Sequence, residues 1–367
     1  MKTERQTGFN EFVKQVVPEE ISFCPGPDGL SSELLSSGIV NHNLKVYLAP
    51  EATPAVLSIY SSNGKERVDR EIFTRSLLGE GTSLPIQRIF HSGYGDTSNG
   101  KEYGFLIKEF KTGDTLNDVL QNMVNEKPED DEIGGLINNL GKNLNILGSI
   151  KMSKFGKIVG NNIIGSSENC SWKDYYSYRL NKRIKTLEDL DPNNTVGEYK
   201  VKDILILTPK LSNYAETQSG ILETVKEPRF VHNDFHFLNI LASQESGTWQ
   251  ISGILDLENA TAGDPEFDLI SIESQLNLSP EYRGLFLANL GRFKDGYKNP
   301  ISNEYLQKRG LYHLTWSLSY FEAVMQMDTN LHPVNSQVNR YMKGHYETLK
   351  SLADGKSLEE IGVPSLC

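Results

Sequence analysis

The side chains best able to do chemistry lie together in residues 230–258. An apolar run ends at Val231, a short loop contains Asp234, and Asn239 follows five residues later, at the start of the next strand-like run. Asp256 ends the following run, and an antiparallel return would bring it to the same sheet edge as Asp234. Carboxylate and amide oxygens suit a hard ion such as Mg²⁺, and one carboxylate is left over as a base. The pattern predicts phosphoryl transfer, in which a base orients a hydroxyl group and metal ligands neutralise the phosphates.

The elements that position these side chains begin with a small sheet in the first third of the chain. Short β-rich runs, separated by Pro and Gly turn signals, occur at 46–48, 56–60, 86–91 and 103–110. The last two flank Asn99-Gly100, a dipeptide suited to a tight hairpin. The charged segment 66–78 has apolar residues at three- to five-residue steps, which predicts one helix on this sheet.

The rest of the chain is predicted to be mainly helical. Apolar residues recur three or four positions apart across 133–147 and again across 311–325. The exceptions are the β-like pieces 230–231 and 249–257, which predict one hairpin with a turn at 243–247.

The length of 367 residues is enough for two domains. We therefore expect an α+β protein. Its small N-terminal lobe would span 1–110 with an antiparallel sheet and one helix, and a larger, mainly helical lobe would span 111–367.

Composition and charge narrow the class of protein. Hydrophobic residues make up 38% and charged residues 23%, as in ordinary globular chains. The formal charge of −11 has the wrong sign for a broad nucleic-acid surface but would suit a cationic small substrate. The three cysteines show no C-x-x-C spacing, which argues against a disulfide framework or a thiolate zinc site. No uncharged apolar run reaches about 18 residues, so we expect no membrane partner. Together with the charge, which argues against a nucleic-acid partner, and the cysteine usage, which fits a reducing compartment, this predicts a cytoplasmic protein.

Three linked blocks of sequence carry a resemblance to a known family. They read HNDFHFLNIL at 232–241, LDLENA at 255–260 and GDPEFDL at 263–269. They are similar to the patterns H-G-D-x-H-x-x-N-I-L, I-D-W/x-x-x-A and G-D-P-x-x-D-L of the aminoglycoside phosphotransferase and choline kinase group. These are small-molecule kinases with a bilobal, protein-kinase-like fold, and the resemblance runs from about residue 30 to 275. It implies a phosphotransferase that uses ATP or GTP as co-substrate together with Mg²⁺.

The resemblance also implies roles for single residues of the second lobe. Asp234 matches the catalytic base, Asn239 and Asp256 match the Mg²⁺ ligands, and Asp268 matches a carboxylate that braces the catalytic loop. His232 belongs to the same predicted catalytic set. A His232–His236 metal pair is the alternative, but no third His or Cys lies nearby at a suitable spacing, so we interpret both as hydrogen-bonding residues of the loop.

In the first lobe the resemblance points to a nucleotide site. Glu71 falls where the family has the helix glutamate that pairs with a phosphate-binding lysine, and Lys108-Glu109-Phe110 falls at the hinge that holds adenine. Ser36-Ser37-Gly38 resembles the loop over the phosphates. The predicted nucleotide-binding residues are thus Ser37, Gly38, Ser58, Glu71, Lys108 and Phe110.

The sequence departs from the family at Ser58, where the strand normally has Lys or Arg. The cation expected on the phosphates is then missing, and Glu71 is predicted to lack its usual partner. Three readings follow: a nearby cation (Lys45, Lys65 or Arg67) replaces it, nucleotide binding is weakened, or the protein is a non-catalytic relative. The Gly of the family loop is also replaced, by Asn233, a residue type that tolerates a positive φ.

Two further groups have a structural and a functional reading. An aromatic cluster could line a substrate pocket, but a role in core packing is favoured for it; its members are Trp172, Tyr175, Tyr176 and Tyr178. A second metal site at Asp264 and Asp268 is less favoured than a structural role at a turn and helix start, because Pro265 suits a first helical position.

The sequence thus predicts a kinase of a small-molecule hydroxyl group, with an aminoglycoside or a related cationic antibiotic as the first choice of acceptor. The alternatives are a kinase of another hydroxylated metabolite, such as an amino alcohol, amino acid or sugar, and a pseudokinase-like binding protein.

Overall fold

A computed structural model describes residues 21, 23–24, 32–37, 41–60, 63–79, 81–96, 102–126, 130–160, 162–167, 170–326 and 336–366. The chain divides into two compact units. The first runs to Thr112 and includes Val159–Asn162, and the second comprises Gly113–Ile158 and the chain from Ile163 onward. None of the described helices is both long enough and apolar enough to cross a lipid bilayer.

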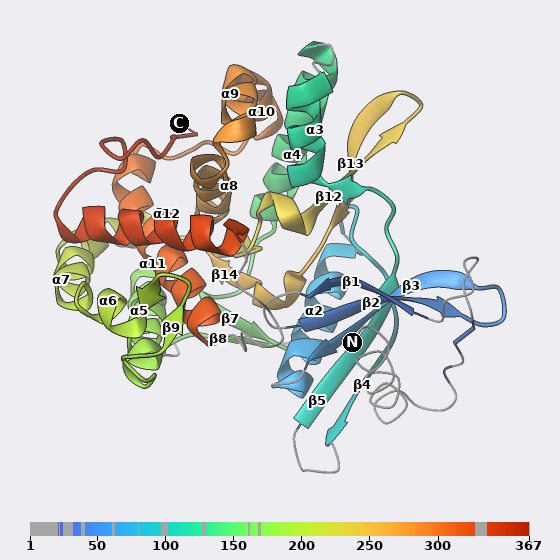
Figure 1. Cartoon of the computed structure of the whole chain (residues 1–367), viewed down its shortest axis with the longest axis horizontal. Helices are drawn as coiled ribbons and strands as arrows, with labels where there is room; N and C mark the ends of the chain where they lie inside the picture. Colours follow the sequence, from blue (N-terminus) through green and yellow to red (C-terminus); the bar gives the residue numbers. More distant parts are fainter. Residues whose placement is uncertain are drawn as a thin grey trace. The chain divides into compact units, whose positions relative to one another are not determined.

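The first unit is a five-stranded antiparallel sheet with one long helix (Figure 1). The strand order is β1-β2-β3-β5-β4. The elements are β1 (Ser32–Ser37), β2 (Asn41–Leu48), β3 (Thr53–Tyr60), α2 (Gly64–Gly79), β4 (Ile89–Asp96) and β5 (Glu102–Glu109). This confirms the predicted small sheet and its single helix over the segment 66–78. The predicted turn Asn99-Gly100 lies outside the described residues.

Strand β3 is buried on both faces, because its alternating side chains enter two different clusters. Ala55, Leu57 and Ile59 pack into one apolar core with residues of β2 and β5. On the opposite face, Tyr60 packs with Val68 of α2 and with β5. The helix therefore covers the sheet face to which Ser58 also belongs.

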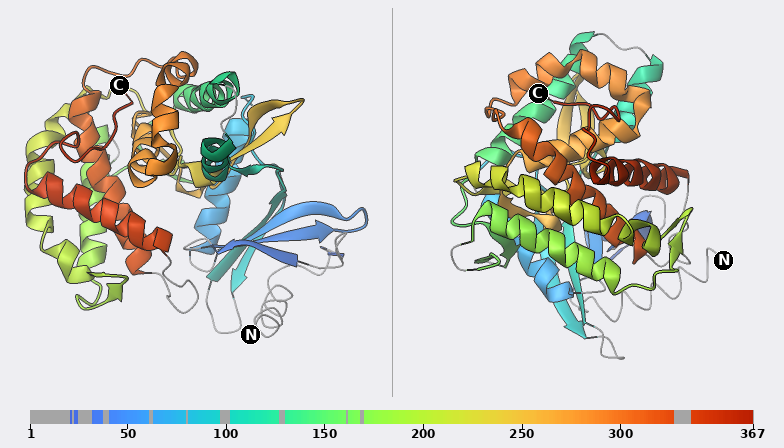
Figure 2. Two further views of the ribbon diagram at one scale, coloured as in Figure 1. Left: turned by 45° about the horizontal axis from the view of Figure 1, so that its top comes forward. Right: turned by 90° about the vertical axis from the view of Figure 1, so that its left-hand side faces the viewer.

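The second unit is mainly helical and also confirms the prediction. Its helices are α3 (Leu116–Glu126), α4 (Asp130–Ser149), α5 (Trp172–Glu188), α6 (Val201–Leu205), α7 (Thr208–Gln218), α8 (Phe267–Leu278), α9 (Pro280–Ala288), α10 (Leu290–Gly296), α11 (Tyr305–Met325) and α12 (Ser336–Ala353), with 3-10 turns η1 (Ser219–Thr224), η2 (Phe237–Asn239) and η3 (Leu257–Asn259). Within this unit two groups of helices can be followed in Figures 1 and 2. One consists of α5, α6, α7, α11 and α12, and the other of α3, α4, α9 and α10.

Short strands form three small sheets, which belong to the second unit apart from Val159 and Asn162. Their bounds are β6 (Asp114–Thr115), β7 (Gly156–Val159), β8 (Asn162–Ile164), β9 (Thr195–Val196), β10 (Tyr199–Lys200), β11 (Arg229–Val231), β12 (Ile240–Glu245), β13 (Thr248–Ile254) and β14 (Thr261–Gly263). The sheet orders are β13-β12-β6, β11-β14-β7-β8 and β10-β9.

The predicted hairpin exists, but its strands are β12 and β13, which pair antiparallel. The prediction was wrong for residues 230–231: they belong to β11, which pairs with β14 in a separate sheet. The chain therefore changes sheet in the loop between Val231 and Ile240, and this loop contains Asp234.

Candidate active site

The loop between β11 and β12 folds back on itself around Asp234. The His236 backbone N–H donates to the Asp234 backbone oxygen at 2.9 Å, and the Asn239 N–H donates to the His236 oxygen at 2.9 Å. The Asn239 side-chain Nδ2 donates to the Asp234 backbone oxygen at 3.1 Å and to its Oδ2 at 3.2 Å. His236 Nε2 lies 3.3 Å from the other carboxylate oxygen, Oδ1. The Asp234 side chain, 22% exposed, is held in place and remains open to solvent.

Asp268, in the first turn of α8, clamps the start of this loop. Its Oδ2 accepts the His232 backbone N–H at 2.8 Å, and its Oδ1 accepts the Asn233 N–H at 2.7 Å. Asn233 has φ of +63°, the left-handed region in which Asn is tolerated. Burial raises the pKa of Asp268 to about 7, although both backbone donors favour the ionised form. The pair of bonds fixes the two residues directly before Asp234.

His232 is fully buried and links the loop to the end of β13. Its Nε2 lies 2.9 Å from the backbone oxygen of Leu255, the residue before Asp256, so this nitrogen carries the proton. Burial lowers the pKa of His232 to about 4, against the opposing charge of Asp234. His232 is therefore a neutral hydrogen-bonding residue at neutral pH.

Asn239 and Asp256 come together because β12 and β13 are antiparallel. The Leu255 backbone N–H donates to the Asn239 oxygen at 2.8 Å, which places Asp256 next to the start of β12. The Asn239 side chain uses its NH₂ group on Asp234, and within the described residues no hydrogen bond occupies its amide oxygen. Asp256 has φ of +60°, so the strand ends there in a sharp change of direction.

The donor set fits a magnesium ion. No cluster of three or more His, Cys, Asp or Glu side chains suited to a metal occurs in the part of the chain that the structure describes. The amide oxygen of Asn239 and the carboxylate of Asp256 instead belong to adjoining strand ends. Mg²⁺ is typically held by one or two protein ligands, with water and phosphate completing its shell.

Arg179 of α5 is a loop contact that the sequence pattern did not reveal. Its Nη2 donates to the Asn233 Oδ1 at 2.8 Å, and its guanidinium lies 5.3 Å from the centroid of the Phe267 ring. Burial lowers the pKa of Arg179 to about 10, so the group stays charged at neutral pH. A cation is thus bonded to the residue that directly precedes Asp234. In the sequence, the one indication of this contact was the position of Arg179 directly after the aromatic cluster of residues 172–178.

In the first unit, β3 supplies no cation to Glu71 at position 58, but other side chains pair with this carboxylate. Its Oε1 accepts from Lys108 Nζ at 3.1 Å and from Arg75 Nε at 3.0 Å, and its Oε2 accepts from the Tyr60 hydroxyl. Burial alone would raise the pKa of Glu71, but the charges of Lys108 and Arg75 and the Tyr60 hydrogen bond lower it far below its usual range. Lys108 reaches Glu71 from β5 and not from β3.

Ser58 lies on the same sheet face but is neutral and engaged. Its hydroxyl donates to Asn43 Oδ1 at 2.6 Å, and its side chain is fully buried. Ser37 ends β1, with its side chain not described, and Gly38 lies outside the described residues. Phe110 directly follows β5, and the ammonium of Lys45 lies 4.7 Å from its ring centroid.

The aromatic residues at the start of α5 pack in the core. Trp172, Tyr175 and Tyr176 are each less than 5% exposed, whereas Tyr178 is exposed. Trp172 Nε1 donates to the hydroxyl of Tyr312 at 2.9 Å, which agrees with the packing role predicted for this cluster.

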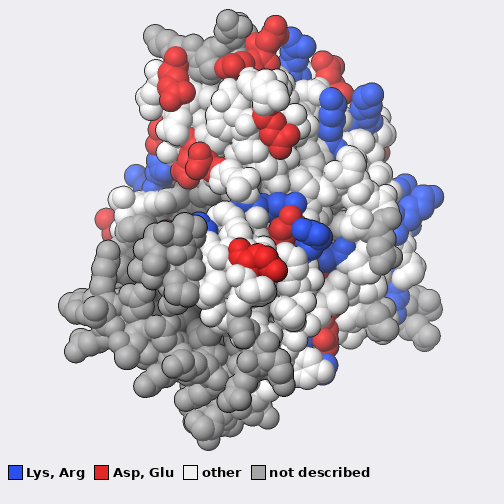
Figure 3. Space-filling model, turned by 90° about the vertical axis from the view of Figure 1, so that its right-hand side faces the viewer, with Lys and Arg blue, Asp and Glu red and all other residues white. Residues whose placement is uncertain are grey.

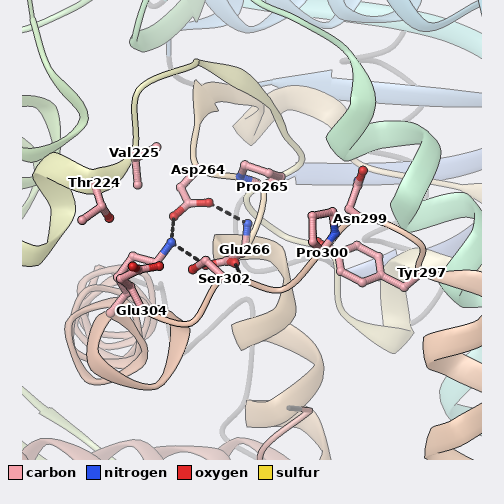
Figure 4. A pocket seen from close by; sticks show the side chains of 11 residues that line it. Thr224, Val225, Asp264, Pro265, Glu266, Tyr297, Asn299, Pro300, Ser302 and Glu304 are labelled. Atoms are coloured by element: carbon pink, nitrogen blue, oxygen red, sulfur yellow. Dashed lines mark hydrogen bonds and ion pairs between the residues drawn. The ribbon is translucent and has the colours of Figure 1, made fainter.

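A cavity of about 300 Å³ lies in the second unit beside Asp264 and Glu266 (Figure 4). Lys308 Nζ contacts Asp264 Oδ2 at 2.7 Å and also pairs with Glu266, and the hydroxyl of Tyr312 donates to Asp264 at 2.6 Å. Because β14 pairs with β11 so that Gly263 faces Arg229, this cavity lies at the opposite end of β11 from Asp234. Asp264 is held by donors on both oxygens, which supports its structural reading.

Comparison with known proteins gives the family context. The sequence model of the phosphotransferase enzyme family matches residues 33–298. None of the curated proteins compared with the chain is similar enough to match it.

Solved structures share the fold at low sequence identity. A thermostable mutant of the aminoglycoside phosphotransferase APH(4)-Ia in its apo form has a TM-score of 0.58 and 15% identity over 89% of this chain and 94% of its own. The GDP and kanamycin complex of APH(2")-IIIa has a TM-score of 0.55 and 16% identity over 95% and 99%. An ethanolamine kinase of Plasmodium vivax has a TM-score of 0.57 and 16% identity over 93% and 87%. These likenesses establish a kinase-like fold of the aminoglycoside phosphotransferase type.

Proposed function

The chain belongs to the phosphotransferase enzyme family and is a phosphotransferase with an alcohol group as acceptor, and we propose that it transfers the γ-phosphoryl group of ATP or GTP to a hydroxyl group of a small molecule. The observation that carries this proposal is the loop geometry of the second unit. Asp234 is partly exposed and held by Asn239, and the antiparallel hairpin brings Asp256 to the same strand ends.

Asp234 is the proposed base. Its carboxylate accepts or orients the proton of the acceptor hydroxyl, and the Asn239 NH₂ group holds one of its oxygens so that the other faces His236 and solvent. Asp268 and His232 are positioning residues, since they bond to the backbone on either side of the site and not to Asp234 itself. Asn239 and Asp256 would hold Mg²⁺, which neutralises charge on the transferred phosphates when bound.

We further propose an aminoglycoside or a related cationic antibiotic as the acceptor. Two relatives of the same fold are named for aminoglycosides, one of them in a complex with kanamycin. The net charge of −11 supports a cationic acceptor only in a general way. Lys and Arg are interspersed with Asp and Glu on the face shown in Figure 3, so that face is no acidic surface.

A second candidate acceptor is another hydroxylated metabolite. A relative of similar structural likeness is an ethanolamine kinase, which supports an amino alcohol. Arg179 beside Asn233 favours instead an acceptor with an anionic group, such as a hydroxy amino acid, because a fixed guanidinium repels a cation close to the loop.

The test is Mg²⁺-dependent consumption of ATP and GTP across a panel of aminoglycosides, amino alcohols, hydroxy amino acids and sugars. Asp234→Asn is expected to reduce turnover by at least about 100-fold, in line with the removal of a general base. Asp295→Asn, an exposed residue of α10, is the matched control and is expected to retain wild-type turnover. Absence of turnover with every acceptor, or equal turnover by the Asp234 variant, would leave the pseudokinase-like reading in place of the enzyme.

A further inference from the structure

We propose that Lys108, reaching across from β5, supplies the phosphate-binding cation that Ser58 cannot supply. The inference rests on the proposed function only in that its ligand is a nucleoside triphosphate. It assigns to Lys108 contact with the phosphates, a role different from the adenine-binding hinge position implied by the resemblance.

The buried cluster around Glu71 carries an unbalanced positive charge. Its members are one carboxylate, the cations Lys108 and Arg75, and the neutral Tyr60, all of them less than a tenth exposed. The sum of +1 is left inside the protein, where an unbalanced charge is costly. An anionic ligand would balance this cluster.

The two cations of this cluster differ in how many of their N–H donors are already hydrogen-bonded. The Arg75 guanidinium already donates to Glu71, to the backbone oxygen of Gln87 at 2.5 Å and to the side chain of Gln87 at 3.3 Å. Lys108 Nζ has three N–H groups, and within the described residues its hydrogen bond is the one to Glu71. Two donors of Lys108 are therefore available to a ligand.

Lys108 is also suitably placed on the sheet. Antiparallel pairing sets Val56 opposite Lys108 and Ser58 opposite Leu106, so Ser58 and Lys108 are diagonal neighbours on one face. Diagonal neighbours lie about 7–8 Å apart at the backbone, a separation that the long lysine side chain spans. Lys108 can thus bring its ammonium close to the place a lysine at position 58 would occupy.

The three cations proposed from the sequence as replacements contact side chains other than Glu71 in the interactions that follow. Lys45 lies over the ring of Phe110, and Lys65 forms an exposed ion pair with Asp69 at 2.8 Å. The guanidinium of Arg67 lies 5.2 Å from the ring centroid of Tyr60. Lys108, in contrast, bonds directly to the carboxylate of Glu71, as the lysine of the family would.

The experiment compares binding of ATP with binding of adenosine, which has no phosphates, by isothermal titration calorimetry. Lys108→Met is expected to weaken ATP binding by about 10- to 100-fold, the value of a charge-assisted hydrogen bond, and to leave adenosine binding within about twofold. Lys108→Gln serves as a second variant, because Gln keeps a hydrogen bond to Glu71 without the charge, and it is expected to show the same ATP-specific loss. Lys111→Met is the matched control, since Lys111 pairs with Glu109 at 3.3 Å on the same segment, and ATP affinity is expected to be unchanged.

The swap variant Ser58→Lys/Lys108→Met tests the position directly. It returns the cation to β3 and is expected to recover ATP affinity to within about threefold of the wild type, which a merely structural role of Lys108 does not predict. Equal weakening of ATP and adenosine in both single variants, or ATP affinity untouched by loss of Lys108, would overturn this inference and leave the proposed function standing. A wild-type protein that binds neither ATP nor GTP would overturn both.

Discussion

Replacing Asp268 with Asn tests whether the loop around Asp234 is positioned from α8. Both carboxylate oxygens accept backbone N–H groups, from His232 at 2.8 Å and from Asn233 at 2.7 Å. An amide offers one acceptor oxygen and one NH₂ donor, so one of these two N–H groups would face another donor. Asp268 is 2% exposed, and water therefore cannot replace the lost acceptor easily.

The size of the effect follows from that single lost bond. Leaving one buried donor unsatisfied costs about 1–3 kcal/mol. For a unit of about 250 residues, 1 kcal/mol lowers the melting temperature by about 2–4 °C, so a fall of about 2–12 °C is expected. With Asp234 as the proposed base, a displacement of about 1 Å of its carboxylate is expected to lower kcat by about 100-fold, since a base must meet the hydroxyl in near-attack geometry.

The assay pairs thermal unfolding with steady-state phosphotransfer, using Asp264→Asn as the matched control. Asp264 belongs to the same GDPEFDL block and is equally buried, but its partners are Lys308 and Tyr312, far along the chain from the loop. The control is expected to lower the melting temperature and to keep kcat in the folded protein within about threefold. Wild-type kcat in the Asp268 variant, or an equal loss of kcat in both variants, would refute positioning of the loop by Asp268.

Three other predictions concern side-chain contacts of the second unit. Burial raises the pKa of Asp268 to about 7, from 3.8 in the unfolded chain, so its proton is bound more tightly in the folded state. The contribution of Asp268 to stability therefore falls as the pH rises from about 4 to 7. In thermal melts over this range, the melting temperature of Asp268→Asn should fall less than that of the wild type. Arg179→Met removes the 2.8 Å bond to Asn233 and should lower kcat by about 10-fold while the nucleotide KM stays unchanged; a changed KM with unchanged kcat would contradict a loop-positioning role. Arg309→Met leaves the buried carboxylate of Glu273 without its main cation and should cost about 3–5 kcal/mol in denaturant unfolding, whereas the double variant with Glu273→Gln should lose less.

The loop could be predicted from sequence because its key residues are close along the chain. Asp234 and Asn239 are five residues apart, and a turn-prone segment at 243–247 between apolar runs indicates a hairpin that returns to Asp256. The partner of β11 could not be predicted in the same way. That partner is the three-residue strand β14, too short to give an alternating pattern of its own.

Contacts between distant segments were beyond the sequence pattern. Arg179 and Asn233 are 54 residues apart, and the spacing of α5 indicates only a buried aromatic face. Asp268 was expected to brace the loop by resemblance, but its two separate N–H partners and its burial emerge only when α8 is placed against the loop.

The case of Glu71 shows why a substitution at one strand position does not by itself reveal a missing charge. The sequence places Ser58 where a cation is expected, and Lys108 in a different motif altogether. Which side chains meet depends on the register of β3 against β5, and a slip of one residue would turn Lys108 to the opposite face, into the apolar core with Leu57 and Ile107. With the observed register, Lys108 and Glu71 pair across 37 residues of sequence. The charge of a sheet face is a property of all its paired strands, so loss of catalysis can be inferred from Ser58 only if its cross-strand neighbours also lack a cation.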